Sequence, residues 1–249
     1  MSIWNQPGAV AYTSRDRIAK QLEIEAIAKY VKDGMTVLDV GCGDGETLLA
    51  LAHRCVISGF GIDSSKAMLS SAWQNKGPMG KSLVTFVEGD ICRTALQDFL
   101  GTFDLIYSER CLINLPDWET QKKAIGNIAK ALKPGGLYVM LENSWEGLQF
   151  INDLREKVGL SRIEPPGHNR YLRDLEVINF AFGNGCDLEP YGIDDYSSTY
   201  YFLSRVVNAA LTPHGQEPDY DSPINKLALS LPAIPGLRGQ GQIWVWRKS

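Results

Sequence analysis

The chain of 249 residues contains no run of apolar residues long enough to cross a membrane. Its first 17 residues lack the charged, apolar and small-residue regions of a secretion signal. Lysine and arginine form no stripe or cluster, and 25 basic against 29 acidic side chains give a net charge of −4. We therefore expect a cytoplasmic protein that binds neither a membrane nor a nucleic acid.

Paired cysteines and clustered metal ligands are also missing. The five cysteines are odd in number, widely scattered and without a Cys-x-x-Cys pair, which predicts reduced thiols and no zinc site. Aspartate and asparagine residues have no spacing that suggests an octahedral metal site, so no metal is expected. Repeats are absent too, and a hydrophobic fraction of 44% with 22% charged residues is typical of one globular domain spanning 1–249.

The most informative stretch is a strand, a glycine turn and a helix in direct succession. Thr36–Val40 is a short apolar run rich in β-branched residues, and Glu46–His53 has the apolar spacing of a helix. Between them, glycines stand at alternate positions, namely Gly41, Gly43 and Gly45. Such glycines let the backbone bend sharply and let a ligand approach closely at the carboxyl end of a strand. The sequence predicts a ligand pocket at this turn.

An acid, Asp39, precedes the first of these glycines and distinguishes between the possible ligands. A carboxylate is a poor neighbour for a pyrophosphate but a good acceptor for an ammonium group or a backbone N–H. The pattern D-x-G-x-G-x-G resembles motif I of the class I S-adenosylmethionine (SAM)-dependent methyltransferases, whereas a dinucleotide fingerprint reads G-x-G-x-x-G. The resemblance implies SAM as cofactor, S-adenosylhomocysteine as product, and a cofactor site that includes Asp39, Gly41, Cys42 and Gly43.

Later strand ends carry further acids that fit a nucleoside. Asp63 follows the glycine turn by about twenty residues, where α/β nucleotide sites place an acid for the ribose hydroxyls, and Ser64 stands beside it. Ser64 can also cap the next helix. In the methyltransferase family, the acid after the third strand accepts from the adenine amino group and the next backbone N–H bonds the ring. Asp90 and Ile91 occupy those positions.

The alternation of segments predicts the fold class. Strands are expected at residues 36–40, 56–62, 83–88, 103–107, 137–141, 194–207 and 242–247. Helical segments alternate with the first five, which predicts an α/β fold with a seven-stranded, mostly parallel, doubly wound sheet. The last strand is expected to be antiparallel, as in the family that residues 30–145 resemble. We interpret residues 145–190, between strands five and six, as a substrate-side insertion or lid.

The first 30 residues are expected to cover the amino-acid end of the cofactor. Thr13 or Ser14 is expected to cap a helix that runs to about residue 31. The family resemblance makes Tyr12 and Arg17 candidates to cover the methionyl group, with Arg17 pairing to its carboxylate. The alternative for Arg17 is an exposed arginine on a surface helix.

The reacting atoms are expected next to the end of the fourth strand, because the sulfonium of SAM and its methyl group lie near this strand end in the methyltransferase family. Ser108 is a candidate cofactor contact, and Glu109 a general base if partly desolvated. Arg110 and Arg170 are candidates to bind an anionic acceptor, although Arg110 can instead pair with Glu109. His168, in a polar loop, has the intrinsic pKa of a base or is simply a loop histidine bonded to backbone.

The predicted function is a SAM-dependent methyltransferase acting on a small molecule, with O-methylation of a sugar, glycoconjugate or other hydroxylated acceptor favoured. Three alternatives remain open: N-methylation of an amine or amino sugar, a non-catalytic SAM-binding protein, and a nicotinamide-dependent oxidoreductase. The partner is expected to be a small-molecule acceptor, and the chain to be a monomer or a homodimer.

Overall fold

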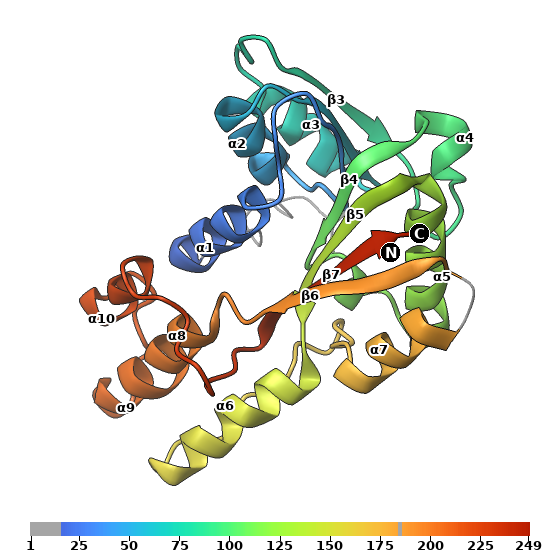
Figure 1. Ribbon diagram of the computed structural model, residues 1–249. Helices are drawn as coiled ribbons and strands as arrows, with labels where there is room; N and C mark the ends of the chain where they lie inside the picture. Colours follow the sequence, from blue (N-terminus) through green and yellow to red (C-terminus); the bar gives the residue numbers. More distant parts are fainter. Residues whose placement is uncertain (1–15, 184–185) are drawn as a thin grey trace.

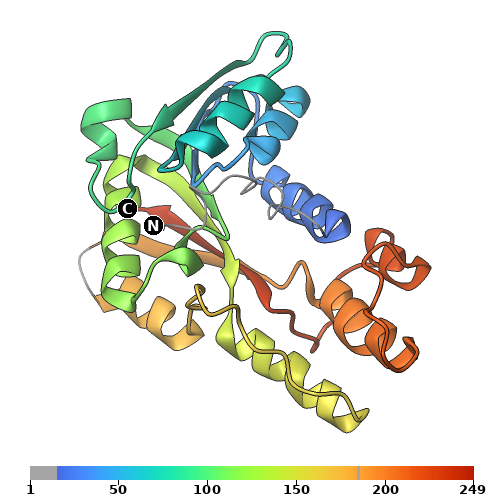
Figure 2. The same ribbon diagram turned by 180° about the vertical axis from the view of Figure 1, so that it is seen from behind.

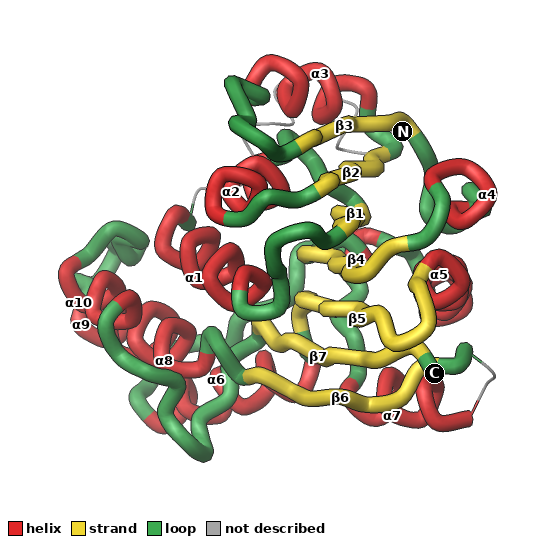
Figure 3. Tube along the Cα trace, turned by 45° about the horizontal axis from the view of Figure 1, so that its top comes forward, coloured by secondary structure: helices red, strands yellow, loops and turns green. Residues whose placement is uncertain are grey.

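The computed structural model describes residues 16–183 and 186–249 and contains a seven-stranded sheet (Figures 1 and 3). Its strand order is β3-β2-β1-β4-β5-β7-β6, and β7 runs antiparallel to both β5 and β6 while the other pairs are parallel. The strands are β1 (Thr36–Val40), β2 (Ser58–Asp63), β3 (Leu83–Glu88), β4 (Phe103–Glu109), β5 (Leu132–Asn143), β6 (Leu188–Asp194) and β7 (Gly241–Lys248). The predicted fold class is confirmed.

Helices cover both faces of the sheet (Figure 3). One face carries α1 (Arg17–Ala28), α2 (Glu46–Arg54) and α3 (Lys66–Asn75). The other face carries α4 (Leu96–Leu100), α5 (Trp118–Ala131) and α7 (Asp174–Gly183). Because the central parallel strands are covered on both sides, β1 is buried along all but its first residue.

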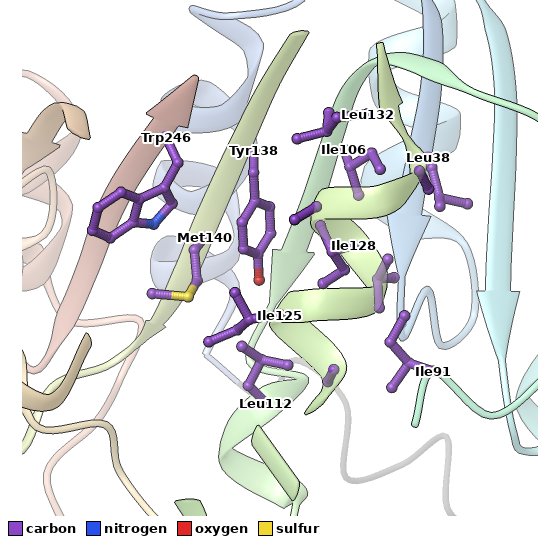
Figure 4. Close-up of a cluster of buried hydrophobic side chains, with 14 of the residues drawn as sticks. Leu38, Ile91, Ile106, Leu112, Ile125, Ile128, Leu132, Tyr138, Met140 and Trp246 are labelled. Atoms are coloured by element: carbon purple, nitrogen blue, oxygen red, sulfur yellow. The ribbon is translucent and has the colours of Figure 1, made fainter. Parts of the chain in front are cut away.

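A large apolar cluster fixes α5 against the sheet (Figure 4). Ile125 and Ile128 of α5 face Ile106, Tyr138 and other side chains that project from the central strands. On the opposite face, a second cluster joins α2 and α3 to the same strands through Val37, among others. Because the two clusters bury many apolar side chains, they keep the strand ends in a fixed arrangement. The loops that follow the strands are therefore held at defined positions.

A group of helices gathers beyond the end of the sheet, away from α4 and α5 (Figures 1 and 2). It contains α6 (Trp145–Lys157), α8 (Ser198–Tyr201), the π-helical stretch η4 (Phe202–Asn208), α9 (Ala209–Leu211), α10 (Pro223–Lys226) and the 3₁₀ turn η5 (Leu227–Leu229). Ile151, Tyr200 and Val206 pack there with Ile18 of α1 in a separate apolar cluster. This cluster therefore ties the C-terminal helices to the first described helix.

The prediction of a sixth strand over residues 194–207 was wrong. The strand ends at Asp194, and the chain from Ser198 to Leu211 is helical. Residues 196–207 are rich in aromatic and β-branched side chains, a composition that favours a strand when considered alone. The helix forms instead because Tyr200, Tyr201 and Val206 pack together on the cluster with α1 and α6, and this tertiary packing overrides the local preference.

Two helix caps also differ from their predictions. Thr13 and Ser14 lie outside the described residues, and Asp16 caps α1 by accepting from the Ala19 backbone N–H at 3.0 Å. Helix α3 is capped by Ser65, whose hydroxyl accepts from Met68 N–H, and not by Ser64.

Among the described helices, none has the length and apolar character needed to cross a membrane.

Candidate functional site

A cavity of about 730 Å³ lies at the carboxyl ends of β1, β2, β3 and β4, where open α/β sheets hold their ligands. The segment between β5 and β6 supplies part of its wall, including Pro166 and Tyr171. The cavity brings together the following residues singled out from the sequence: Asp39, Gly41, Cys42, Gly43, Asp63, Ser64, Asp90, Ile91, Glu109, Arg110 and His168.

The glycine turn forms the floor of the cavity in a backbone conformation that suits glycine. Gly41, Gly43 and Gly45 have φ values of 75°, 53° and 77°. A Cβ on Gly41 would lie 2.4 Å from Cys111 Sγ, so the two chain segments touch there. A Cβ on Gly43 would meet nothing within 4 Å, because this residue borders the open cavity. Gly41 thus serves close packing, and Gly43 leaves room for a ligand.

Asp63, at the end of β2, is tied to this turn. One carboxylate oxygen accepts from the Gly43 N–H at 2.9 Å, and the other accepts from the Ser65 N–H at 2.8 Å. Burial raises the pKa of Asp63, while these backbone bonds oppose the increase. The Ser64 backbone N–H also bonds this carboxylate. A carboxylate has about four acceptor positions and the side chain borders the cavity, so it can accept a further hydrogen bond from a ligand.

Asp90 and Ile91 border the cavity from the loop after β3. The Asp90 carboxylate accepts from the Cys92 N–H at 2.8 Å and pairs with Arg93 at 3.3 Å. Ile91 is buried and presents an apolar surface beside Met68, which also lines the cavity. This part of the cavity therefore combines an acid with an apolar wall, as a purine ring requires.

Four charged side chains meet where α1 packs against the end of β4. Lys20 donates to Glu109 Oε1 at 2.5 Å, and the Thr47 hydroxyl donates to Glu109 Oε2 at 2.6 Å. Arg110 Nε lies 3.2 Å from Glu23 Oε1, in a backbone with φ of 50° that is unusual for arginine. Lys20, Glu109 and Arg110 border the cavity, which therefore has an organised group of charges at one end.

This arrangement changes the ionisation of the two glutamates in opposite directions. Burial works to raise the pKa of Glu109, but Lys20 and Arg110 outweigh it and lower the pKa to about 2. Burial raises the pKa of Glu23 to about 8. A carboxylate that is ionised, paired and of such low pKa is a poor proton acceptor near neutrality, so this environment disfavours Glu109 as a general base.

Asp39 is the most deeply buried acid of the turn, with 3% of its surface exposed. Its carboxylate accepts from the Tyr107 hydroxyl at 2.8 Å. Burial raises the pKa of Asp39 to about 8, the negative charge of Glu109 adds to the rise, and the bond from Tyr107 opposes it. The ionisation of Asp39 is therefore sensitive to any positive charge that enters the cavity.

Amide and hydroxyl groups line another part of the cavity. Asn114, Asn143 and Asn169 come from three different segments, and Tyr171 and His168 lie with them. Asn169 Oδ1 is buried with no hydrogen-bond partner among the described residues. Buried polar groups normally have partners, so this oxygen is available to a donor on a bound molecule.

Several residues predicted from the sequence lie elsewhere. The Arg17 guanidinium is exposed and pairs with Glu46 of α2, so it does not line the cavity. Ser108 is fully buried and lies 2.9 Å from the Tyr138 hydroxyl, on the side of β4 that faces the core. Arg170 pairs with Glu176 and bonds Gln121. Tyr12 lies outside the described residues.

Lys20 is a cavity residue that our sequence reasoning did not single out. One pattern signals it: Lys20 shares a helical face with Glu23 and Ile27, because these residues are three and four positions apart. Charged residues on the buried face of a helix require partners.

No group of three or more histidine, cysteine, aspartate or glutamate residues with the geometry of a metal site occurs within residues 16–183 and 186–249.

Comparison with known families relates the chain to methyltransferases. Residues 38–140 match a family model described as a methyltransferase domain. The chain is 37% identical over 102 residues to a trans-aconitate 2-methyltransferase of Deinococcus radiodurans, covering 41% of this chain and 35% of that protein. It is 37% identical over 116 residues to a demethylmenaquinone methyltransferase of Bacillus licheniformis, covering 46% and 47%. The chain thus spans less than half the length of these curated relatives.

A solved structure extends the similarity over nearly the whole fold. Magnesium protoporphyrin IX methyltransferase from Synechocystis PCC 6803, with S-adenosylhomocysteine bound, superposes with a TM-score of 0.64 at 14% identity. The superposition covers 99% of this chain and 97% of that one. At this identity, the similarity supports the fold alone.

Proposed function

We propose that this protein, whose residues 38–140 form a methyltransferase domain of the class I SAM-dependent family, transfers the methyl group of SAM to a small molecule. One observation carries the proposal: residues from the ends of four parallel strands and from the segment after β5 line a common cavity. The cavity volume of about 730 Å³ lies toward the upper part of the range of small-molecule sites, which suits a cofactor together with an acceptor.

In this proposal, different residues of the cavity hold different parts of the cofactor. Asp63 accepts from the ribose hydroxyls, and Asp90 with Ile91 contacts the adenine. The methionyl group extends toward Lys20 and Glu109, which offer a cation for its carboxylate and an anion for its ammonium group. Lys20 therefore takes the role that the sequence analysis assigned to Arg17.

The acceptor is proposed to be a hydroxylated small molecule that is methylated on oxygen. The amide groups of Asn114, Asn143 and Asn169 can donate to and accept from several hydroxyl groups, as a sugar or polyol requires. An alcohol needs a group that removes its proton, and His168 on the same wall is our candidate. The segment 145–190 is then the substrate-side wall of the site.

The direct test is incubation with SAM carrying a labelled methyl group and a panel of sugars, polyols and amines. Label in a hydroxylated compound supports the proposal, and label only in amines supports the N-methyltransferase alternative. Tight binding of SAM without transfer to any acceptor favours a non-catalytic binding protein. Binding of reduced nicotinamide dinucleotide in place of SAM contradicts the proposal.

We predict that His168→Ala lowers turnover by about 10²-fold or more, the usual contribution of a general base, and leaves SAM affinity near that of the wild type. The affinity is retained because the proposal assigns His168 to the acceptor and not to the cofactor. Calorimetry with SAM and initial-rate measurements check the two parts. Asn169→Ala is the control for a residue that contacts acceptor without removing its proton, because the Asn169 Oδ1 has no partner among the described residues. Full turnover in His168→Ala removes this histidine from the mechanism.

We also predict that SAM binds more tightly as the pH rises toward 8. The pKa of Asp39 is about 8 in the free protein, and the positive charges of SAM lower it on binding. Affinity therefore falls as the pH drops below 8, because SAM must then displace a proton from Asp39. Calorimetry across this range, in buffers of different ionisation enthalpy, measures the proton release. Asp39→Asn removes this proton, so an unchanged pH dependence in the variant contradicts the prediction.

A further inference from the structure

A fully buried carboxylate, Glu142 at the end of β5, organises the turn that follows β4. Its Oε1 accepts from the backbone N–H groups of Cys111 at 3.2 Å and Leu112 at 3.0 Å. Its Oε2 accepts from the Ile113 N–H at 3.3 Å. The residue is 0% exposed, and it does not border the cavity. These bonds satisfy the free N–H groups at the start of the 3₁₀ turn η3 (Leu112–Asn114).

The turn held by Glu142 touches both halves of the cavity. On the cofactor side, Cys111 packs directly on Gly41, as the 2.4 Å approach of its sulfur to a Cβ built there indicates. On the acceptor side, the Ile113 carbonyl accepts from the Arg170 N–H at 2.7 Å. The buried Gln121 amide also donates to the carbonyls of Leu112 and Arg170, at 3.0 Å each. Gly41 and Arg170 are thus joined by continuous contacts.

We propose that Glu142 is a positioning residue that couples the cofactor turn to the acceptor wall, through the turn Cys111–Ile113 and its bond to Arg170. The inference rests on the proposed function, because the two halves of the cavity are assigned there. When a nucleoside binds beside Gly41, it contacts Cys111 and restricts its motion. Because the Glu142 carboxylate bonds Cys111, Leu112 and Ile113 together, the motion of Ile113 and of its partner Arg170 is restricted as well. The cofactor thereby orders the loop that carries His168 and Asn169.

The ionisation of Glu142 supports the geometry. Burial raises its pKa to about 7, while the three backbone bonds and a bond from the Ser108 side chain work to lower it. The titratable groups that face it are the Tyr138 hydroxyl on β5 and the Cys111 thiol on the turn. Burial raises the pKa of both well above the ordinary values, so they stay protonated near neutrality. Deprotonation of Glu142 strengthens its three accepted bonds.

The test is residue-resolved amide hydrogen exchange in the wild type and in Glu142→Gln, with and without S-adenosylhomocysteine. Glutamine at this position keeps one oxygen that accepts hydrogen bonds. Its NH₂ group, however, faces a backbone N–H of the turn, and two donors cannot bond each other. We expect exchange at Ile113 and Arg170 to accelerate about tenfold or more. In the wild type, S-adenosylhomocysteine slows exchange at Arg170. Glu142→Gln still binds S-adenosylhomocysteine within about threefold of the wild-type affinity. In this variant, however, the ligand no longer slows exchange of the Arg170 amide.

A matched control and a second measurement separate this role from a local stabilising one. Glu146→Gln makes the same substitution at a nearby carboxylate that accepts from the Asp174 N–H and does not contact the turn. An equal acceleration in Glu146→Gln, or retained protection of Arg170 by ligand in Glu142→Gln, overturns the proposal.

If Glu142→Gln does not fold, exchange of the wild type with and without S-adenosylhomocysteine decides the question. Slower exchange at Ile113 and Arg170 on binding supports the coupling, and unchanged exchange at Arg170 overturns it. Failure of S-adenosylhomocysteine to bind the wild type would contradict the proposed function, while the exchange measured without ligand still tests whether Glu142 controls Arg170.

Discussion

Gly41→Ala is expected to destabilise the protein by about 2–5 kcal/mol, the sum of a left-handed backbone penalty and an overpacking cost. Gly41 has φ of 75°, which alanine adopts only with strain. An added Cβ would lie 2.4 Å from Cys111 Sγ and 2.8 Å from Cys111 Cβ. Rotation of the thiol relieves only the first contact. Denaturant unfolding, compared with the wild type at one temperature, measures the loss.

Two other glycines serve as controls for this prediction. Gly34 has φ of 83° and free space around a Cβ, and it does not border the cavity. Gly34→Ala should therefore destabilise the protein by the backbone penalty alone, about 1–2 kcal/mol. Gly43→Ala has the same free space, but its methyl group projects where the cofactor is proposed to lie. It should weaken SAM binding more than stability. A loss in Gly41→Ala no larger than in Gly34→Ala contradicts the close packing.

Asp63→Ala is expected to weaken SAM binding by about 1.5–3 kcal/mol, the value of a hydrogen bond to a charged group. The carboxylate accepts from Gly43 and Ser65 and is proposed to accept from the ribose as well. Removal also frees the two backbone N–H groups that fix the glycine turn. Calorimetric titration with SAM and with S-adenosylhomocysteine measures the change, and both ligands should be affected alike because they share the ribose.

The control for Asp63→Ala is Asp33→Ala. Asp33 also accepts from a backbone N–H, that of Val56 at 2.7 Å, but it does not border the cavity. This variant should bind SAM as the wild type does. Unchanged affinity in Asp63→Ala, measured on folded protein, contradicts the ribose role.

The sheet was predictable because its signals are local. The strand at 36–40 lies between glycines, and the strand at 83–88 is found at the same residues in the structure. The fold class predicted from the alternation of segments is confirmed by the sheet topology, and residues 38–140 match a methyltransferase-domain model, in agreement with the predicted family. Residues near strand ends, such as Asp39 and Asp63, were found from the same signals, since parallel strands bring their carboxyl ends to one edge.

The remaining errors arise where side-chain direction or distant packing decides. Ser108 and Glu109 are neighbours in the sequence, but alternation along β4 turns Ser108 to Tyr138 and Glu109 to the cavity. Lys20 neutralises Glu109 from a helix that lies 89 residues away in the chain. The helix at 198–211 forms because its aromatic residues pack on α1 and α6. None of these contacts has a signal within a short window of sequence.

The structure of the protein with S-adenosylhomocysteine bound tests the central claim most directly. Our account predicts the ribose hydroxyls within hydrogen-bond distance of Asp63, the adenine beside Asp90 and Ile91, and the amino-acid end at Lys20 and Glu109. A nucleoside bound outside this cavity, or no binding by correctly folded protein, would contradict the assignment of the cavity and the proposed methyl transfer with it.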